Sequence, residues 1–371
     1  MKITFLMPCY PWSPMGGFRV VYEYANQLVE RGHEVTVVHA RAVKSGPRKL
    51  SWYEKLRDLK IGLATRHVTP TVNWHKIDPL VRLLFVPDTD ALHLPDADAI
   101  FATAWNTVAP VLSYSPSKGT KFYLIQHYET WLGPKVAPKN LVDETWRSPL
   151  NKIVVSKWLL ALGTELRAGH LEYIPNAVDH DRYRILTPVR TRPKQVAMMF
   201  SHVPFKGSKD GIQALEIAKK RHPDLNAVFF GTGRDADWIP KWVQYHREPA
   251  QDFIVREIYN KSSVFVSPSW AEGFALPPAE AACCGCAVVA TDSGGIADFI
   301  EHGQTGLLSK PQNAQALGEN LCRVLEDDHL RLTLAEACER KLSAFTWEKS
   351  TKMLESAIES SRKLDRDFQT V

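Results

Sequence analysis

Two short apolar strands that flank an alanine-rich helical segment constrain the fold of this chain more than any other feature. The strands are predicted at 264–266 and 287–290, and Gly285 follows the helical segment between them. A strand, a helix and a second strand in this order form a βαβ unit with parallel strands. Polar residues follow each strand, so we expect them at the carboxyl edge of the sheet, where open parallel sheets bind ligands.

The loop and the helix of this unit carry two glutamates, Glu272 and Glu280, in the sequence E-G-F-A-L-P-P-A-E. Glu272 falls in the loop, and Glu280 is predicted about two turns into the helix. The residues that open the helix offer free N–H groups, which can hold a phosphate. They are Gly273, Phe274, Ala275 and Leu276. One carboxylate can then bind sugar hydroxyls and the other ribose hydroxyls, on opposite sides of a diphosphate.

Length and composition predict a two-domain globular protein. The chain of 371 residues exceeds one ordinary hydrophobic core, and its 23% of charged residues is typical of soluble proteins. The sequence has no run of about 18 apolar residues of the kind that crosses a membrane. The first apolar run stops at Pro8, which fits a buried strand rather than a signal peptide. We therefore expect a cytoplasmic protein, and we expect no nucleic-acid partner.

Neither the cysteines nor the acidic pairs predict a metal site. Three of the six cysteines crowd at Cys283, Cys284 and Cys286, whereas structural zinc needs spaced pairs or added histidines. Buried thiols beside a strand are the better interpretation. Two Asp-x-Asp sequences, at 88–90 and 96–98, are predicted in surface turns, and neither is expected to follow a strand.

The net charge of +5 has its densest basic stretch at residues 41–60. Seven lysines and arginines stand there against Glu54 and Asp58, with aromatic and leucine residues between them. Such a stretch can lie on an anionic membrane surface. The alternative is a solvated loop and helix that packs its apolar side on its own domain.

Short apolar strands alternate with helical patterns along the chain. Besides the two strands above, strands are predicted at 3–7, 35–39, 99–102, 122–126, 152–156, 195–200 and 227–231. Amphipathic helices are predicted at 18–31 and 347–363. This alternation indicates βαβ units and parallel sheets. The segment 179–194 is polar, rich in arginine and contains Pro188 and Pro193, so it predicts an interdomain linker.

Further segments occur in the order expected of one enzyme family. They are G-G-F-R-V-V and R-G-H-E-V-T-V-V near the start, I-P-N-A-V-D at 174–179, the Lys206-Gly207 pair, P-S-W-A-E-G-F-A-L-P, A-A-C-C-G-C-A-V-V-A-T-D-S-G-G and H-G-Q-T-G-L-L. With the E-x7-E spacing of Glu272 and Glu280, they resemble glycosyltransferase family 4, the retaining nucleotide-sugar glycosyltransferases of the GT-B fold.

The resemblance implies two Rossmann-like α/β domains, each with a doubly wound parallel sheet, that face each other across a cleft. Residues 1–178 would form the acceptor-side domain, 179–194 the linker and 195–345 the nucleotide-sugar domain. Residues 346–371 would form a helix that crosses back to the first domain.

The resemblance also implies three catalytic residues, Glu272, His127 and Lys206. Lys206 would meet the leaving diphosphate as a point charge. His127 would orient the donor sugar, and its alternative role is a cap at the end of a strand. The family supplies an arginine about five residues before the lysine, where this chain has Ser201 and His202.

The other implied site residues face the donor or the acceptor. A protonated His202, or Arg234, would replace the charge of the missing arginine. Gly16 and Arg19 would face the acceptor, although Arg19 fits a surface position equally well. Tyr245 lies in the segment 243–246, which is expected to follow a short strand and to read the base through its backbone. The remaining donor-side residues are Gly17, Gly231, Thr232 and Gly233.

The implied reaction moves a sugar from a nucleoside diphosphate to a glycan or lipid-linked glycan acceptor, as in bacterial polysaccharide biosynthesis. The leaving phosphate would accept the acceptor's proton, so Glu129 is not assigned as a base. Lys206 and helix amides would stabilise the leaving group without a metal or other cofactor. The alternatives are a nucleotide-sugar epimerase, a phosphorylase, and a catalytically silent nucleotide-sugar-binding relative. Donor hydrolysis would separate an enzyme from the silent relative.

Overall fold

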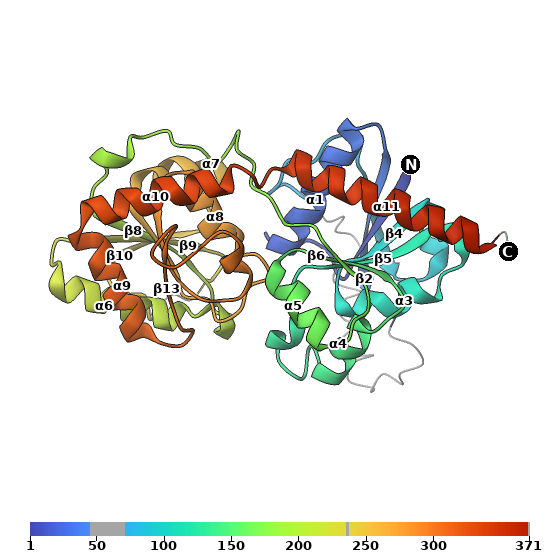
Figure 1. The fold of residues 1–371 in the computed structure, drawn as a ribbon, viewed down its shortest axis with the longest axis horizontal. Helices are drawn as coiled ribbons and strands as arrows, with labels where there is room; N and C mark the ends of the chain where they lie inside the picture. The colour runs from blue at the N-terminus through green and yellow to red at the C-terminus, as the bar shows by residue number, and fades with distance from the viewer. Residues whose placement is uncertain (45–70, 235–236, 370–371) are drawn as a thin grey trace. The chain divides into compact units, whose positions relative to one another are not determined.

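The computed structural model describes residues 1–44, 71–234 and 237–369, which form two compact units (Figure 1). Unit 1 comprises Met1–Val154, Gly163–Glu172 and the chain from Thr351 onward. Unit 2 comprises Val155–Leu162 and Tyr173–Ser350. The predicted fold class, two Rossmann-like parallel sheets, is confirmed, since each unit is built around one such sheet.

The sheet of unit 1 has seven strands among the described residues, in the order β3-β2-β1-β4-β5-β6-β7. The pairings from β3 to β6 are all parallel. The strands are β1 (Lys2–Met7), β2 (Glu34–Ala42), β3 (Arg82–Asp88), β4 (Ala99–Ala102), β5 (Thr120–Ile125), β6 (Asn151–Val154) and β7 (Leu171–Tyr173). The five predicted strands are present. β3 and β7 were not predicted; β3 contains Pro87, which an edge strand tolerates.

The position of β3 corrects one expectation about acidic pairs. Asp88-Thr89-Asp90 directly follows the body of this strand, because Asp88 is its last residue. Both aspartates pair with a lysine, since Lys44 Nζ lies 3.0 Å from a carboxylate oxygen of each. The Asp90 carboxylate also accepts a hydrogen bond from the Leu92 amide. The basic stretch 41–60 falls largely on residues 45–70, outside the described residues.

The helix after β1 is α1 (Gly16–Glu30), which buries Phe18, Val21, Ala25 and Leu28 at helical spacing. It begins two residues earlier than predicted, so Gly16 and Gly17 form its first turn rather than the preceding loop. The next helices along the chain are α3 (Val108–Ser113), α4 (Lys139–Trp146) and α5 (Lys157–Glu165).

The last helix, α11 (Trp347–Gln369), belongs to unit 1 from Thr351 onward (Figure 1). Its Leu354 and Ile358 are buried, and its polar side is held by ion pairs. Glu355 pairs with Arg31 at 2.6 Å and with His33 at 2.8 Å. These contacts fix the helix on the end of α1 and the start of β2.

The sheet of unit 2 has six strands among the described residues, in the order β10-β9-β8-β11-β12-β13. All its neighbouring strands are parallel. The strands are β8 (Gln195–Phe200), β9 (Asn226–Gly231), β10 (Val243–Arg247), β11 (Val264–Ser267), β12 (Ala287–Thr291) and β13 (Leu307–Ser309). The four predicted strands are confirmed. The segment 243–246 is itself a strand and does not follow one, and β13 was not predicted.

Helices pack on the core of unit 2, where the apolar side chains of β8, β11 and β12 meet Leu215, Leu317 and Leu321. The helical segments are α6 (Ser208–Arg221), α7 (Gln251–Phe253), a π-helical turn (Ile254–Ile258), α8 (Leu276–Cys283), α9 (Ala314–Glu326) and α10 (Asp328–Leu342). Throughout the described chain, every helix is too short or too polar to cross a bilayer.

The segment 179–194 is tied to unit 2 through a buried residue, Arg192, which is 6% exposed. Its guanidinium donates hydrogen bonds to Thr187 O, Tyr259 O, Ser262 O, Cys284 O and Asn260 Oδ1. The segment was expected to be a polar linker without regular structure. The structure shows that it also anchors on the strand and helix ends of unit 2.

Candidate functional site

The centre of the unit 2 sheet, where β8 and β11 lie side by side, positions the candidate site. From this pair the chain adds strands on one side of the sheet in the order β8, β9, β10 and on the other side in the order β11, β12, β13. The pair is therefore the topological switch point, the place at which open α/β sheets bind ligands. The loops after β8 and β11 both leave the sheet at its carboxyl edge. Lys206 comes from the first loop and Glu272 from the second.

Lys206 and Glu272 form an ion pair. Lys206 Nζ lies 2.8 Å from Oε1 and 2.9 Å from Oε2 of Glu272, so both carboxylate oxygens contact the ammonium group. The Glu272 side chain is 11% exposed and that of Lys206 is 24% exposed. The sequence predicted that both bind one donor, but it did not predict that they contact each other.

The loop that carries Lys206 is held against the loop after β11. Gly207 has a φ of +64°, and a Cβ there would lie 2.0 Å from Pro268 O, so only glycine fits. The Trp270 amide donates to Phe205 O at 2.7 Å, and the Trp270 indole donates to Asp210 at 2.6 Å. These contacts preorganise the backbone on both sides of the ion pair.

The segment after Glu272 presents backbone amides. The Glu272 amide donates to Ser293 O at 2.7 Å, which fixes the loop to the end of β12. Among the described residues, no acceptor is found for the amides of Gly273, Phe274 and Ala275. The Phe274 ring is buried against Phe299 and Phe345, and this packing fixes the backbone that carries the three amides. Amides of this kind at a helix N-terminus suit an anion.

Glu280 lies deeper in the protein than expected. α8 begins at Leu276, so Glu280 is its fifth residue, little more than one turn into the helix and not two. It is 3% exposed, and the Tyr259 hydroxyl donates to it at 3.4 Å. Its assignment to the ribose stays a prediction.

The residues in place of the family arginine have different surroundings. Ser201 shapes the turn after β8, since its amide donates to Ser208 Oγ at 2.9 Å and its hydroxyl accepts from the Val203 amide. The His202 ring packs edge-on against Phe200 and Trp238. Whether His202 replaces the arginine charge stays a prediction.

The structure brings together three predicted donor-side residues at the carboxyl edge of β8, β9 and β10. The Tyr245 hydroxyl donates to Gly233 O at 2.8 Å. The backbone of Gly233 lies against the His202 ring, since a Cβ at Gly233 would be 2.7 Å from His202 Nε2. Gly231 ends β9 and leads through Thr232 into this turn, and Arg234 is exposed beyond it.

The predicted residues of unit 1 gather at the carboxyl ends of β1 and β5. Gly17 is in the first turn of α1, and its carbonyl accepts a hydrogen bond from Gln126 Nε2 at 3.0 Å. His127 is the next residue after Gln126, and both follow β5. Gly16 is exposed and Arg19 is partly buried. Gly17 and His127 are therefore neighbours through Gln126.

Gly17 is not explained by the fold. Its φ lies outside the left-handed region, and a Cβ there would meet only the Gln126 side chain, at an ordinary 3.5 Å. Glycine also disfavours helix formation relative to alanine. A ligand that approaches the backbone closely would explain the residue.

Glu129 is a candidate that the sequence named but did not characterise. Its carboxylate accepts hydrogen bonds from the Trp105 amide at 2.9 Å and the Tyr123 hydroxyl at 3.2 Å. Burial raises the pKa of the Glu129 carboxyl to about 7, although both hydrogen bonds oppose the shift. A group that titrates near neutral pH stands at the carboxyl edge of β5, close in sequence to His127.

The cysteines near the signature are buried, as expected. Cys283 is 3% exposed, and Cys284 and Cys286 are fully buried. The Cys286 thiol donates to Tyr259 O, and burial raises its pKa to about 12. These thiols are therefore un-ionised core groups.

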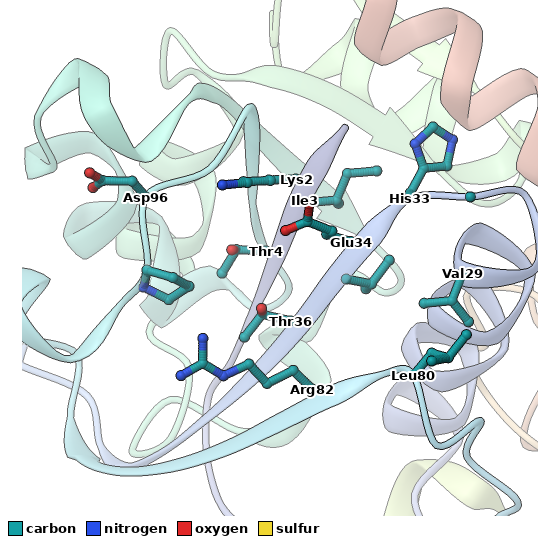
Figure 2. A pocket seen from close by; sticks show the side chains of 13 residues that line it. Lys2, Ile3, Thr4, Val29, His33, Glu34, Thr36, Leu80, Arg82 and Asp96 are labelled. Carbon is teal, nitrogen blue, oxygen red and sulfur yellow. The ribbon is translucent and has the colours of Figure 1, made fainter.

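Of two cavities in the structure, one adjoins the ion pair of Lys206 and Glu272 and the other is remote from every predicted site residue. One of about 10 Å³ lies under the ion pair and is lined by Lys206, Glu272 and the β11 end. The other, of about 500 Å³, is at the amino edge of the unit 1 sheet, whereas Gly17 and His127 lie at the carboxyl edge of that sheet. Figure 2 shows its lining side chains from three neighbouring strands, Lys2, Thr4, Glu34, Thr36 and Arg82. The larger cavity contains none of the predicted site residues.

Comparison with known proteins identifies the family. Residues 181–341 match the glycosyl transferases group 1 family. The chain is 27% identical over 383 residues to glycogen synthase of Mycobacterium tuberculosis, with 94% of this chain and 92% of that protein covered. It is 28% identical over 193 residues to N,N'-diacetylbacillosaminyl-diphospho-undecaprenol alpha-1,3-N-acetylgalactosaminyltransferase of Campylobacter jejuni. That match covers 50% of this chain and about half, 48%, of the relative.

Among solved structures, HepE of Anabaena in complex with UDP-glucose is similar with a TM-score of 0.72 and 17% identity. The similarity covers 97% of this chain and 100% of that chain, and at this identity it concerns the fold. The sequence resemblance is thereby confirmed: residues 181–341, most of unit 2, belong to the group 1 glycosyl transferases, glycosyltransferase family 4, whose members have the GT-B fold and take a sugar from a nucleotide-sugar donor.

Proposed function

We propose that this protein is a retaining glycosyltransferase that moves a sugar from a nucleoside diphosphate donor to a glycan or lipid-linked glycan. The observation that carries the proposal is the ion pair of Lys206 and Glu272 at the switch point of unit 2, with its Nζ–Oε1 distance of 2.8 Å. It places a cation and a carboxylate beside a helix start whose first amides have no acceptor among the described residues. A diphosphate and a sugar need these groups together.

The chemistry follows from the charge that develops in the reaction. As the glycosidic bond breaks, negative charge grows on the diphosphate, where Lys206 and the amides of Gly273, Phe274 and Ala275 stabilise it. Glu272 accepts hydrogen bonds from the sugar hydroxyls. The acceptor attacks from the face that the diphosphate leaves, and the leaving phosphate oxygen takes the acceptor's proton. The configuration at the anomeric carbon is therefore retained.

The other residues position the two substrates. Glu280 binds the ribose, and the turn at Gly231–Gly233 with Tyr245 contacts the base. Gly17 and His127 face the reacting sugar, and Gly16 and Arg19 the acceptor. Because the charge on the leaving group is met by Lys206 and backbone amides, we propose that transfer needs no metal ion.

The relatives suggest which substrates to test first. HepE was solved with UDP-glucose, and the name of the Campylobacter relative specifies a sugar on undecaprenyl diphosphate as its acceptor. We therefore propose a UDP-sugar donor and an acceptor of the lipid-linked type, in polysaccharide biosynthesis at the inner face of the membrane.

The test is a panel of UDP-, TDP- and GDP-sugars, followed by mass spectrometry for binding, for slow hydrolysis and for transfer. We expect one nucleotide sugar to bind and to be hydrolysed with release of a sugar that keeps the anomeric configuration of its donor, as read by NMR, at a rate that EDTA does not change. Release of the opposite anomer would contradict retention, and loss of turnover in EDTA that magnesium restores would contradict metal independence. Binding without turnover of any donor or acceptor would favour the catalytically silent alternative. The absence of the family arginine at 201–202 is the observation that supports this alternative.

A further inference from the structure

A second group of reactive side chains lies in unit 2, at the far end of α6 from Lys206. His222 follows the last residue of α6, and Cys322 and Glu326 are on α9. The imidazole nitrogen, thiol sulfur and carboxylate oxygen that these residues offer all lie within 4.8 Å of one another. α6 has 14 residues, so this group is about 20 Å along the helix from the ion pair. It plays no part in the transfer chemistry above.

The backbone holds the three residues in place. Cys322 and Glu326 are four residues apart on one helix, and therefore share a face. α6 and α9 approach closely, since a Cβ at Gly318 would lie 3.0 Å from the Ile217 side chain. The His222 amide donates to Ala218 O at 2.8 Å and its carbonyl accepts from Leu225 at 2.9 Å. The cluster is thus preorganised by helix packing.

The donor atoms have few protein partners, although the Arg221 guanidinium interacts with the Cys322 thiol. His222 Nε2 is shielded from water and makes no hydrogen bond, although it lies 3.5 Å from Glu326 Oε1. Cys322 is fully buried, and burial raises the pKa of its thiol while the neighbouring Arg221 lowers it. The Glu326 side chain is 50% exposed and leaves a route to solvent.

One of the three separations already suits zinc, and the other two are at most 4.8 Å. Bonds of about 2.0–2.3 Å to a tetrahedral ion place neighbouring ligand atoms roughly 3.3–3.8 Å apart, and the nitrogen–oxygen distance of 3.5 Å already lies in that range. A thiolate with an imidazole and a carboxylate selects zinc over magnesium or calcium. The thiolate and the carboxylate together balance the two positive charges of the ion.

We propose that His222, Cys322 and Glu326 bind one zinc ion, with water as the fourth ligand. On binding, the Cys322 thiol gives its proton to solvent and its sulfur bonds to the metal. The ion joins the carboxyl end of α6 to α9 and stabilises unit 2. This site differs from the sequence expectation that the cysteines bind no metal. His222 and Cys322 are too far apart in the sequence for motif spacing to connect them.

Cobalt substitution tests the site on the full-length protein, reduced and freed of metal. We expect one equivalent of Co²⁺ to give a thiolate-to-cobalt charge-transfer band and tetrahedral d–d bands, and zinc to displace both. Cys322→Ser should abolish the charge-transfer band. His222→Gln and Glu326→Gln should each weaken zinc binding by about tenfold or more. Cys338→Ser, which removes another fully buried thiol of unit 2, is the matched control and should leave the spectrum unchanged.

Several outcomes would overturn the proposal. These are the absence of a charge-transfer band in the wild type, a band that survives Cys322→Ser, and a band lost equally in Cys338→Ser. Because Cys322→Ser alters a core position, circular dichroism of each variant is compared first. His222→Gln, at a less buried position, then decides independently: unchanged zinc affinity in that variant would exclude the site.

Discussion

Lys206 Nζ lies 2.8 Å from Oε1 of Glu272, so the group proposed to hold the leaving diphosphate is neutralised by the group proposed to hold the sugar. Two charges taken partly out of water compensate each other before any substrate binds. A donor that brings a diphosphate and sugar hydroxyls offers each of them a new partner. The pair is therefore a preorganised site for a ligand with both chemistries.

Lys206→Ala should lower turnover by about 100- to 1000-fold, because one preorganised cation is lost from the leaving group. Nucleotide affinity should fall much less, and added magnesium should not restore the rate. Steady-state kinetics with a donor-binding titration measures both. Lys209→Ala, three residues further along on α6, is the matched control and should behave like the wild type. Wild-type turnover in Lys206→Ala would show that another cation, with Arg234 the first candidate, holds the diphosphate.

The ion pair of Lys206 and Glu272 should also contribute to the free energy of unfolding. Lys206→Met leaves the Glu272 carboxylate, whose side chain is 11% exposed, without this partner, and Glu272→Gln removes the charge that Lys206 neutralises. We expect a coupling free energy of about 0.5–3 kcal/mol between the two substitutions. Urea denaturation of both single variants and the double variant measures it. Additive effects would mean that the contact contributes nothing to the folded state.

Gly17 separates a structural role from a functional one. Gly17→Ala should keep or raise the free energy of unfolding, by up to about 1 kcal/mol, because alanine favours the first turn of α1. Transfer should nevertheless slow, since the new Cβ occupies the space where a substrate would approach. Gly207→Ala is the contrast: its Cβ would lie 2.0 Å from Pro268 O, so it should lose stability. Unchanged turnover in a stable Gly17→Ala protein would remove Gly17 from the site.

Arg192 tests whether 179–194 is more than a linker. Arg192→Met keeps an unbranched apolar stem but removes the guanidinium, and it leaves several buried carbonyl groups without their donor, which should cost on the order of 3 kcal/mol. Thermal and urea unfolding measure the loss. Arg190→Met is the control, because the Arg190 side chain is 77% exposed and its ion pair is long, at 4.0 Å. If both variants unfold alike, the segment is not anchored by Arg192.

Local patterns predicted the sheets because each buried strand is a continuous apolar run in the sequence. β3 was not predicted because Pro87 lies inside it. β10 was not predicted because its sequence, V-Q-Y-H-R, contains only one fully apolar residue, Val243. An edge strand needs less apolar sequence than a central one, since one side of it is unpaired. Edge strands are therefore where the sequence predicted the fold least well.

Contacts between distant residues were the other part that the sequence did not reveal. Motif spacing named Lys206 and Glu272 singly, but their contact depends on β8 and β11 being adjacent in the sheet. The sequence also did not reveal the group of His222 and Cys322, because it depends on the end of α6 lying beside α9. The anchoring of Arg192 depends on distant residues in the same way. The environment of Glu129 depends on Trp105 and Tyr123, which come from two other elements.

Glu129 provides a prediction about pH. In the folded protein, burial raises its pKa from the usual 4.5 to about 7, so the folded state holds the proton more tightly than the unfolded state. Its contribution to the free energy of unfolding is therefore fully present below pH 4.5 and is lost as the pH rises to about 7. Above that pH both states are ionised, and the contribution no longer changes.

Glu129→Gln isolates this contribution, because glutamine keeps an acceptor oxygen for the Trp105 amide and the Tyr123 hydroxyl but does not titrate. The wild-type stability minus that of the variant should fall between pH 4.5 and about 7, as measured by urea unfolding at matched pH values. Glu144→Gln changes an exposed carboxylate on α4 and serves as the control. A difference that is flat over this range would mean that Glu129 is ionised in the folded protein. If Glu129→Gln also keeps its transfer rate across the same range, the proton of the acceptor substrate does not go to Glu129. The phosphate of the donor is then the group that takes this proton.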